Sequence, residues 1–108
     1  MKTFNVETEK VGTTLHVRLF GEFDLLAYDN VDEVLSDAQA HDQPDMVVDL
    51  RGLSFIDSSG IRALLRANLR AEEAGGTLKL LAGPANVQRV FEVAGLGTKL
   101  HFIASDPA

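Results

Sequence analysis

The segment Asp57-Ser58-Ser59-Gly60 places a carboxylate and two hydroxyl groups next to one another. It follows an apolar run at residues 46–48, and from Ile61 onward the apolar spacing is helical. The segment is therefore expected at the start of a helix, where Asp57 or Ser58 can accept hydrogen bonds from the free backbone N–H groups. The partial positive charge of the helix end also suits an anion there. A helix cap is the simplest interpretation of these local features, and a hydroxyl with a chemical role is the alternative.

Catalysis by a serine needs a base, usually His, that a third group orients. The three histidines, His16, His41 and His101, fall on or after separate expected elements, and no Gly-x-Ser-x-Gly elbow occurs. Neither a glycine-rich phosphate loop nor metal-ligand spacing is found. Asp49, at a strand end, suggests the phosphoacceptor aspartate of a response-regulator receiver domain. That fold also requires an acidic pair after its first strand, whereas this chain is expected to open with a β-hairpin. We therefore expect no enzyme activity, no cofactor and no metal.

The elements that position these groups begin with a β-hairpin, because residues 3–9 and 13–20 both alternate between apolar and polar. His16 falls on the polar face of the second strand and is expected in solvent rather than as a ligand. Gly21-Glu22-Phe23-Asp24 is expected to break that strand. The remaining strands are expected at 45–50, 77–82 and 99–103, with a turn at 42–45 and a tail at 105–108.

Three helices alternate with the later strands. The first is expected over 26–41, with Asp24 as a possible cap, the second runs from the 57–60 segment to Gly75-Gly76, and the third begins at Pro84. Their expected apolar stripes are Leu26, Val31, Val34, Leu35 and Ala38; Ile61, Leu64, Leu65, Asn68 and Leu69; and Val87, Val90, Phe91 and Ala94. This alternation predicts an α/β fold with a mixed, mostly parallel sheet and an antiparallel hairpin strand at one edge.

Composition limits the function classes. The chain has 108 residues, enough for one domain over 1–108, and its 45% hydrophobic and 24% charged residues are typical of a soluble globular protein. It has no cysteine, so disulfides and thiolate chemistry are excluded, and a cytoplasmic location is expected. The net charge of −6 disfavours nucleic acid as a partner. No apolar stretch is of signal-peptide or bilayer-spanning type, so no membrane insertion is expected.

Asp57-Ser58-Ser59-Gly60, preceded by Leu53-Ser54-Phe55-Ile56 and followed by Ile61, closely resembles the signature of STAS domains of the anti-sigma factor antagonist (anti-anti-sigma) type. Gly21-Glu22-Phe23-Asp24 resembles the family's early Gly-Glu-Leu-Asp turn, and residues 84–96 resemble its last helix. The resemblance extends over about residues 3–103 and implies the STAS fold, a five-stranded mixed sheet with three main helices. One departure is that residues 25–28, Leu-Leu-Ala-Tyr, follow the early turn where the family usually has small or hydroxyl residues. That surface lies near the family's phosphorylated serine, so the departure bears on partner identity.

The resemblance implies a binding module switched by phosphorylation. In the family, the first Ser after the Asp is modified by a partner kinase, which indicates Ser58 here, with Ser59 as the second choice. The unmodified chain would bind an anti-sigma factor with serine kinase activity, phosphorylation would release it, and a serine phosphatase would restore binding. The expected contact residues are Asp24, Asp57, Ser58, Ser59, Gly60 and Arg62. Asp57 could orient the Ser58 hydroxyl or merely cap the helix.

Arg62, Arg66 and Arg70 repeat every four residues and are expected on one face of the second helix. A solvated face is the simple interpretation, and a basic docking ridge beside Ser58 is the functional one. Three alternatives to the antagonist function stay open. The chain could be a STAS subunit docked on the ATPase of a lipid-transport ABC complex, a module of a larger stress-signalling assembly (although such relatives often carry Thr at the phosphosite), or a small-ligand binder.

Overall fold

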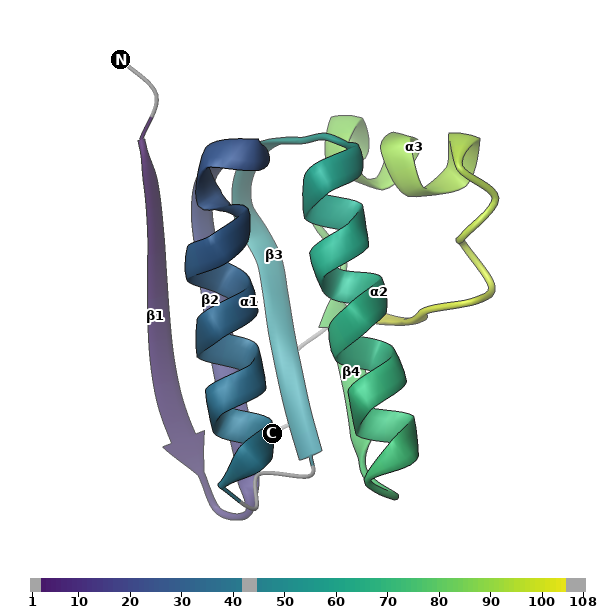
Figure 1. Ribbon diagram of the computed structural model, residues 1–108. Coiled ribbons are helices and arrows are strands. Elements are labelled where there is room, and N and C mark those ends of the chain that lie inside the picture. Colours follow the sequence, from purple (N-terminus) through teal and green to yellow (C-terminus); the bar gives the residue numbers. More distant parts are fainter. Residues whose placement is uncertain (1–2, 42–44, 105–108) are drawn as a thin grey trace.

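The structure is a computed structural model, and it describes residues 3–41 and 45–104. One mixed sheet is covered on one face by two helices that lie side by side, while a third helix lies across one end (Figure 1). The elements in chain order are β1 (Phe4–Val11), β2 (Thr14–Phe23), α1 (Leu25–Ala40), β3 (Asp45–Ile56), α2 (Ser58–Glu73), β4 (Thr77–Leu81), α3 (Ala85–Val93) and β5 (His101–Ile103). Most of the turn expected at 42–45 lies outside the described residues. The whole tail at 105–108 also lies outside them.

The sheet has five strands in the order β1-β2-β3-β4-β5. β1 and β2 form an antiparallel hairpin, and β2, β3, β4 and β5 are parallel neighbours. The predicted α/β fold, with its edge hairpin and mostly parallel sheet, is therefore confirmed. Because parallel strands end at the same edge, β2 and β3 deliver the starts of α1 and α2 to one end of the molecule (Figure 1).

Two strands are longer than the sequence pattern predicted. β2 does not break at Gly21, and β3 does not stop at residue 50 but continues to Ile56. The two extensions pair with each other as far as Phe23 and Ile56, with irregular register on the way. A Cβ on Gly52 would stand 2.4 Å from the ring of Phe20, so this glycine lets the two strands approach closely. The residues between 51 and 56 are thus the end of a strand rather than a loop.

The core lies between the helices and the sheet. Its fully buried large side chains include Leu19, Phe23, Leu50, Leu64 and Phe91. α2 packs against α1 and the sheet mainly through its small and branched residues Ile61, Ala63, Leu64, Ala67 and Ala71.

Four positions differ from the expected burial. The predicted apolar stripes include Leu26, Leu69 and Ala94, but all three residues are exposed. In α1 and α2, Ala27 and Ala67 take the positions that face the core, and Ala94 lies just after the end of α3. His16 was expected in solvent but is only 6% exposed. It lies in the middle of β2, where Glu9 of β1 and Val47 of β3 are its neighbours in the sheet.

Candidate functional site

The junction between β3 and α2 holds the serine pair. Asp57 has extended backbone, and its side chain accepts hydrogen bonds from the Ser59 N–H at 2.8 Å and the Gly60 N–H at 3.3 Å. Asp57 is therefore the N-cap, and Ser58 is the first residue of the helix. A cap of this kind fixes the direction in which the first turn leaves the strand, so the position of Ser58 is set by local backbone geometry.

The three residues after the cap differ in accessibility. Ser58 is exposed, Ser59 is half-buried and Gly60 is buried. An exposed Ser58 hydroxyl is open to an enzyme that approaches from outside, whereas Ser59 is partly enclosed. A Cβ on Gly60 would stand 2.6 Å from Cγ1 of Ile56 and 3.0 Å from Cγ of Phe23. Gly60 therefore acts first as a packing residue that lets α2 begin close to the ends of both central strands.

The early turn lies against this junction. The Asp57 N–H donates to the Phe23 carbonyl at 3.2 Å, which joins the end of β2 to the start of α2. Asp24, the next residue, caps α1 by accepting from the Leu26 N–H at 3.0 Å and is only 8% exposed. The structure thus brings Asp24 and Asp57 together as caps of neighbouring helices. Both carboxylates hold backbone groups, so each contributes to the shape of the site as well as its negative charge.

Exposed apolar side chains lie at the same end of the molecule as Ser58, and the sequence pattern did not predict them as a group. Leu25 and Leu26 begin α1, Phe55 lies just before the cap of α2, and Val93 lies on α3; their exposed fractions are 67%, 84%, 42% and 81%. Apolar side chains clustered on the surface of a small protein mark a surface that binds another protein. The departure at Leu25 and Leu26 was the one available signal; Phe55 and Val93 become visible only when the ends of β3 and α3 are placed at the same end of the fold.

The three arginines of α2 have different surroundings. Arg70 contacts Asp32 of α1 at 3.3 Å and donates to the Gln39 side chain at 2.8 Å, and Arg66 approaches Asp32 at 3.9 Å. Arg66 and Arg70 therefore join α2 to α1 instead of forming a free ridge. Arg62 is exposed and, among the described residues, makes no hydrogen bond or ion pair.

Asp49, the alternative phosphoacceptor, is occupied by an ion pair. Its carboxylate is 8% exposed and contacts Arg51 in a two-pronged arrangement, with distances of 2.9 Å to Nη2 and 3.1 Å to Nε. Burial acts to raise the pKa of Asp49, but the hydrogen bonds and charge of Arg51 outweigh it and leave the pKa below its ordinary value. This geometry suits a structural ion pair rather than a phosphoacceptor.

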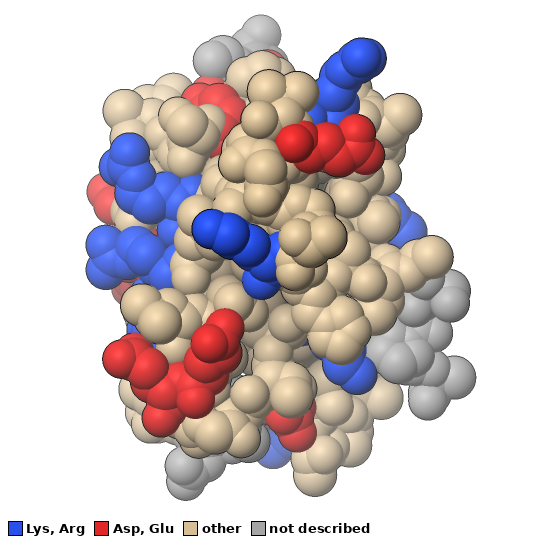
Figure 2. Space-filling view, turned by 90° about the vertical axis from the view of Figure 1, so that its right-hand side faces the viewer, with Lys and Arg blue, Asp and Glu red and all other residues tan. Residues whose placement is uncertain are grey.

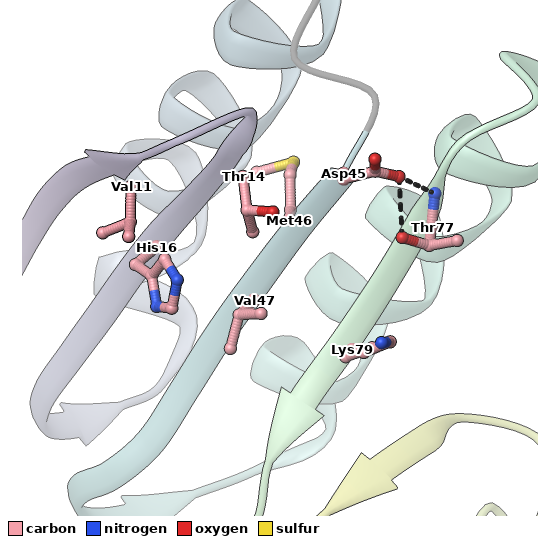
Figure 3. A pocket seen from close by; sticks show the side chains of 8 residues that line it. All are labelled: Val11, Thr14, His16, Asp45, Met46, Val47, Thr77 and Lys79. Atoms are coloured by element: carbon pink, nitrogen blue, oxygen red, sulfur yellow. Dashed lines mark hydrogen bonds between the residues drawn. The ribbon is translucent and has the colours of Figure 1, made fainter. Parts of the chain in front are cut away.

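A cavity of about 330 Å³ lies at the opposite end of the sheet, where β3 and β4 begin (Figure 3). His16, Val47 and Lys79 line it from neighbouring strands, and Asp45 at its edge accepts hydrogen bonds from the backbone and hydroxyl of Thr77. The cavity is separated from Ser58 by the length of β3. Within the described part of the chain, no group of three or more His, Asp or Glu side chains is arranged to hold a metal ion, and no helix is long and apolar enough to cross a bilayer.

Comparison with known proteins identifies relatives of the whole fold. The family model described as "Mlab, STAS domain" matches residues 6–103. The anti-sigma F factor antagonist of Lysinibacillus sphaericus is 34% identical over 85 residues, which cover 78% of this chain and 73% of that protein.

Two solved structures of SpoIIAA are also similar. The anti-sigma factor antagonist SpoIIAA in its unphosphorylated form is 29% identical, with a TM-score of 0.81 and coverage of 94% of this chain and 90% of that chain. The Bacillus cell fate determinant SpoIIAA in the phosphorylated form is 28% identical, with a TM-score of 0.74 and coverage of 94% and 93%. With a family match over nearly all of its length, the chain belongs to the STAS domain family and, within it, to the anti-sigma factor antagonists.

Proposed function

We propose that this chain is a phosphorylation-switched binding module. It binds an anti-sigma factor with serine kinase activity while Ser58 is unmodified, and releases it once Ser58 carries a phosphate. The observation that carries the proposal is the exposed Ser58 at the capped start of α2, in a chain whose relatives are anti-sigma factor antagonists. That a similar protein has been solved in phosphorylated and unphosphorylated forms supports the same switch here.

In the phosphoryl transfer, this chain contributes only the acceptor hydroxyl. The Ser58 oxygen attacks the γ-phosphorus of ATP, a phosphate ester forms, the bond to ADP breaks, and the hydroxyl proton passes to a base. The partner kinase supplies the nucleotide, the metal and that base, and this chain supplies only a positioned hydroxyl. A serine phosphatase then hydrolyses the ester and restores the binding form. We assign no catalytic role to any residue of the chain.

Release follows from charge and bulk at the interface. A phosphate adds a charge of about −1.5 to −2 beside Asp57 and Asp24. The helix dipole partly stabilises this charge, so the module stays folded while its docking surface changes. A loss of about 1.4 kcal/mol weakens binding tenfold, so a modest clash is sufficient for a switch.

The docking surface we propose is the end of the molecule where α1 and α2 begin. Its polar centre is Ser58 and Ser59, with the caps Asp24 and Asp57 below them. Arg62, which has no partner within the described residues, is its basic contact. The exposed apolar residues around this centre supply the area that a protein partner would cover.

The site assignment is tested by incubating the protein with ATP and its cognate kinase and mapping the modified residue by mass spectrometry. We expect phosphate on Ser58, no incorporation in Ser58→Ala, and continued incorporation in the matched variant Ser59→Ala. Incorporation that persists in Ser58→Ala refutes the assignment. A serine phosphatase should remove the label, and the recovered protein should bind the kinase again.

A second candidate is a permanent subunit, docked on the ATPase of a lipid-transport ABC complex. The exposed Leu25, Leu26 and Val93 favour it, because lasting interfaces cover more apolar surface than transient ones do. Stable copurification with a transporter ATPase, unaffected by ATP and by Ser58→Asp, would support this candidate over the switch.

A further inference from the structure

Two arginines flank Ser58 from different helices. Arg62 lies four residues after Ser58 on α2, which places the two side chains on the same face of the helix, one turn apart. Helical side chains lean toward the N-terminus, so the Arg62 guanidinium is directed back toward Ser58. Arg89 lies on α3 and lines the same groove as Ser58.

Neither guanidinium group is engaged within the described residues. Arg62 and Arg89 are both exposed, and no hydrogen bond or ion pair to either exists in this part of the chain. Arg66 and Arg70, which continue the same α2 face, both contact Asp32. Two free cations therefore lie next to the serine, while the cations further along the helix are used to join α1 and α2.

The groove between α2 and α3 has a volume of about 410 Å³ and is lined by Ser58, Ile61, Asn86, Arg89, Val90, Val93 and Ala94. It contains no acidic lining residue, although the chain as a whole carries a net charge of −6. Figure 2 shows the side of the molecule on which α3 lies, where basic side chains gather toward the left edge, acidic ones gather below them, and uncharged residues cover most of the rest. Apolar walls lower the local dielectric and strengthen an ion pair formed at the mouth of the groove.

The two backbone N–H groups that follow Ser58 are already used. The N–H groups of Ser59 and Gly60 both donate to the Asp57 carboxylate. A phosphate on Ser58 has three strong acceptor oxygens, which need more donors than the Ser58 N–H alone can supply. Guanidinium groups supply paired N–H donors in the geometry that phosphate oxygens accept.

We propose that a phosphate on Ser58 is bound within this chain by Arg62 and Arg89, across the mouth of the groove between α2 and α3. This inference rests on the proposed function, because it requires the phosphate at Ser58. It adds a second effect to the switch. Phosphorylation withdraws Arg62 from the docking surface and holds Arg89 over the neighbouring groove, so the partner loses the Arg62 contact as well as meeting new negative charge.

The test installs phosphoserine at position 58 by genetic encoding, so that no kinase is needed, and follows the second pKa of the phosphate by ³¹P NMR. Proteins with Arg62 and Arg89 intact should titrate below the ordinary value of about 6. The double variant Arg62→Gln/Arg89→Gln should titrate higher by about one pH unit, as expected when two neighbouring cations are removed. Arg66→Gln, the matched control one turn further along α2, should leave the titration unchanged.

A double variant that titrates like the parent protein overturns the inference. A second readout is independent of any variant: the side-chain N–H signals of Arg62 and Arg89 should shift on phosphorylation, and unchanged signals for both overturn the inference as well. The proposed function fails separately, if the cognate kinase binds the phosphoserine protein as tightly as the unmodified one. The two failures are distinguishable because the titration involves no partner.

Discussion

Asp57 carries the clearest quantitative prediction, because one side chain holds the first turn of α2. Its carboxylate accepts two backbone N–H groups, at 2.8 and 3.3 Å, and it lies at the positive end of the helix. Replacing an N-cap Asp by Ala typically costs about 1 kcal/mol, to which the lost charge adds about 0.3–1 kcal/mol. We therefore expect Asp57→Ala to lower the free energy of unfolding by about 1–2 kcal/mol. The melting temperature should fall by about 5 °C.

The matched variant is Asp57→Asn, because Asn caps helices about as well as Asp and removes only the charge. Its free energy of unfolding should fall by less than about 1 kcal/mol. Asp29→Ala, which removes an exposed carboxylate from α1, serves as the control for charge alone. Urea denaturation at neutral pH measures all three.

The same pair of variants separates the two roles open to Asp57. If Asp57 only caps the helix, Asp57→Asn keeps the parent's rate of phosphorylation by the cognate kinase. If Asp57 also orients the Ser58 hydroxyl, the rate falls while stability is nearly kept. An Asn variant as unstable as the Ala variant contradicts the capping account, because the side-chain oxygen would then not be the group that matters.

Three further predictions concern the surroundings of the site. Gly60→Ala should lower the free energy of unfolding by about 1–2 kcal/mol, because the strain of an added methyl group exceeds the gain of about 1 kcal/mol in helix propensity. The control Gly97→Ala, where a Cβ meets nothing within 4 Å, should leave the free energy of unfolding nearly unchanged in the same urea experiment. Asp32→Asn should cost about 1 kcal/mol through the lost pairs with two α2 arginines, and high salt should shrink the difference from the parent protein in urea titrations. The pKa of Asp49 is lowered in the folded protein, so its pairing with Arg51 stabilises the fold fully above the ordinary pKa of 3.8, and this stabilisation is lost as the pH falls through the folded value. The difference in free energy of unfolding between the parent protein and Asp49→Asn should therefore disappear between pH 5 and strong acid. A difference that grows on acidification would contradict the direction of the pKa shift.

The element order could be predicted because apolar periodicity changes clearly along this chain. The alternation in the first two strands and the helical spacing after Ile61 indicate which face of each element is buried. Asp24 and Asp57 lie where helix caps are expected. The family signature adds the prediction that Ser58 is the phosphorylated residue. These signals are local, and each can be read from a short window of sequence.

The remaining features depend on contacts between distant segments. The extra length of β2 and β3 comes from their pairing with each other, which no single window reveals. His16 lies on a strand between β1 and β3, which its own sequence window does not reveal. Arg66 and Arg70 are paired because Asp32 lies on the adjacent helix. The exposed apolar side chains at the end of the molecule that carries Ser58 belong to three separate segments of the chain, and only the fold brings these segments to one end.

The phosphorylation switch is tested by measuring the affinity of the cognate kinase-type anti-sigma factor for two forms of this protein, unmodified and carrying encoded phosphoserine at position 58. We expect the phosphorylated form to bind at least about tenfold more weakly, a loss of about 1.4 kcal/mol, while both forms unfold at similar urea concentrations. Equal affinity for the two folded forms would contradict it.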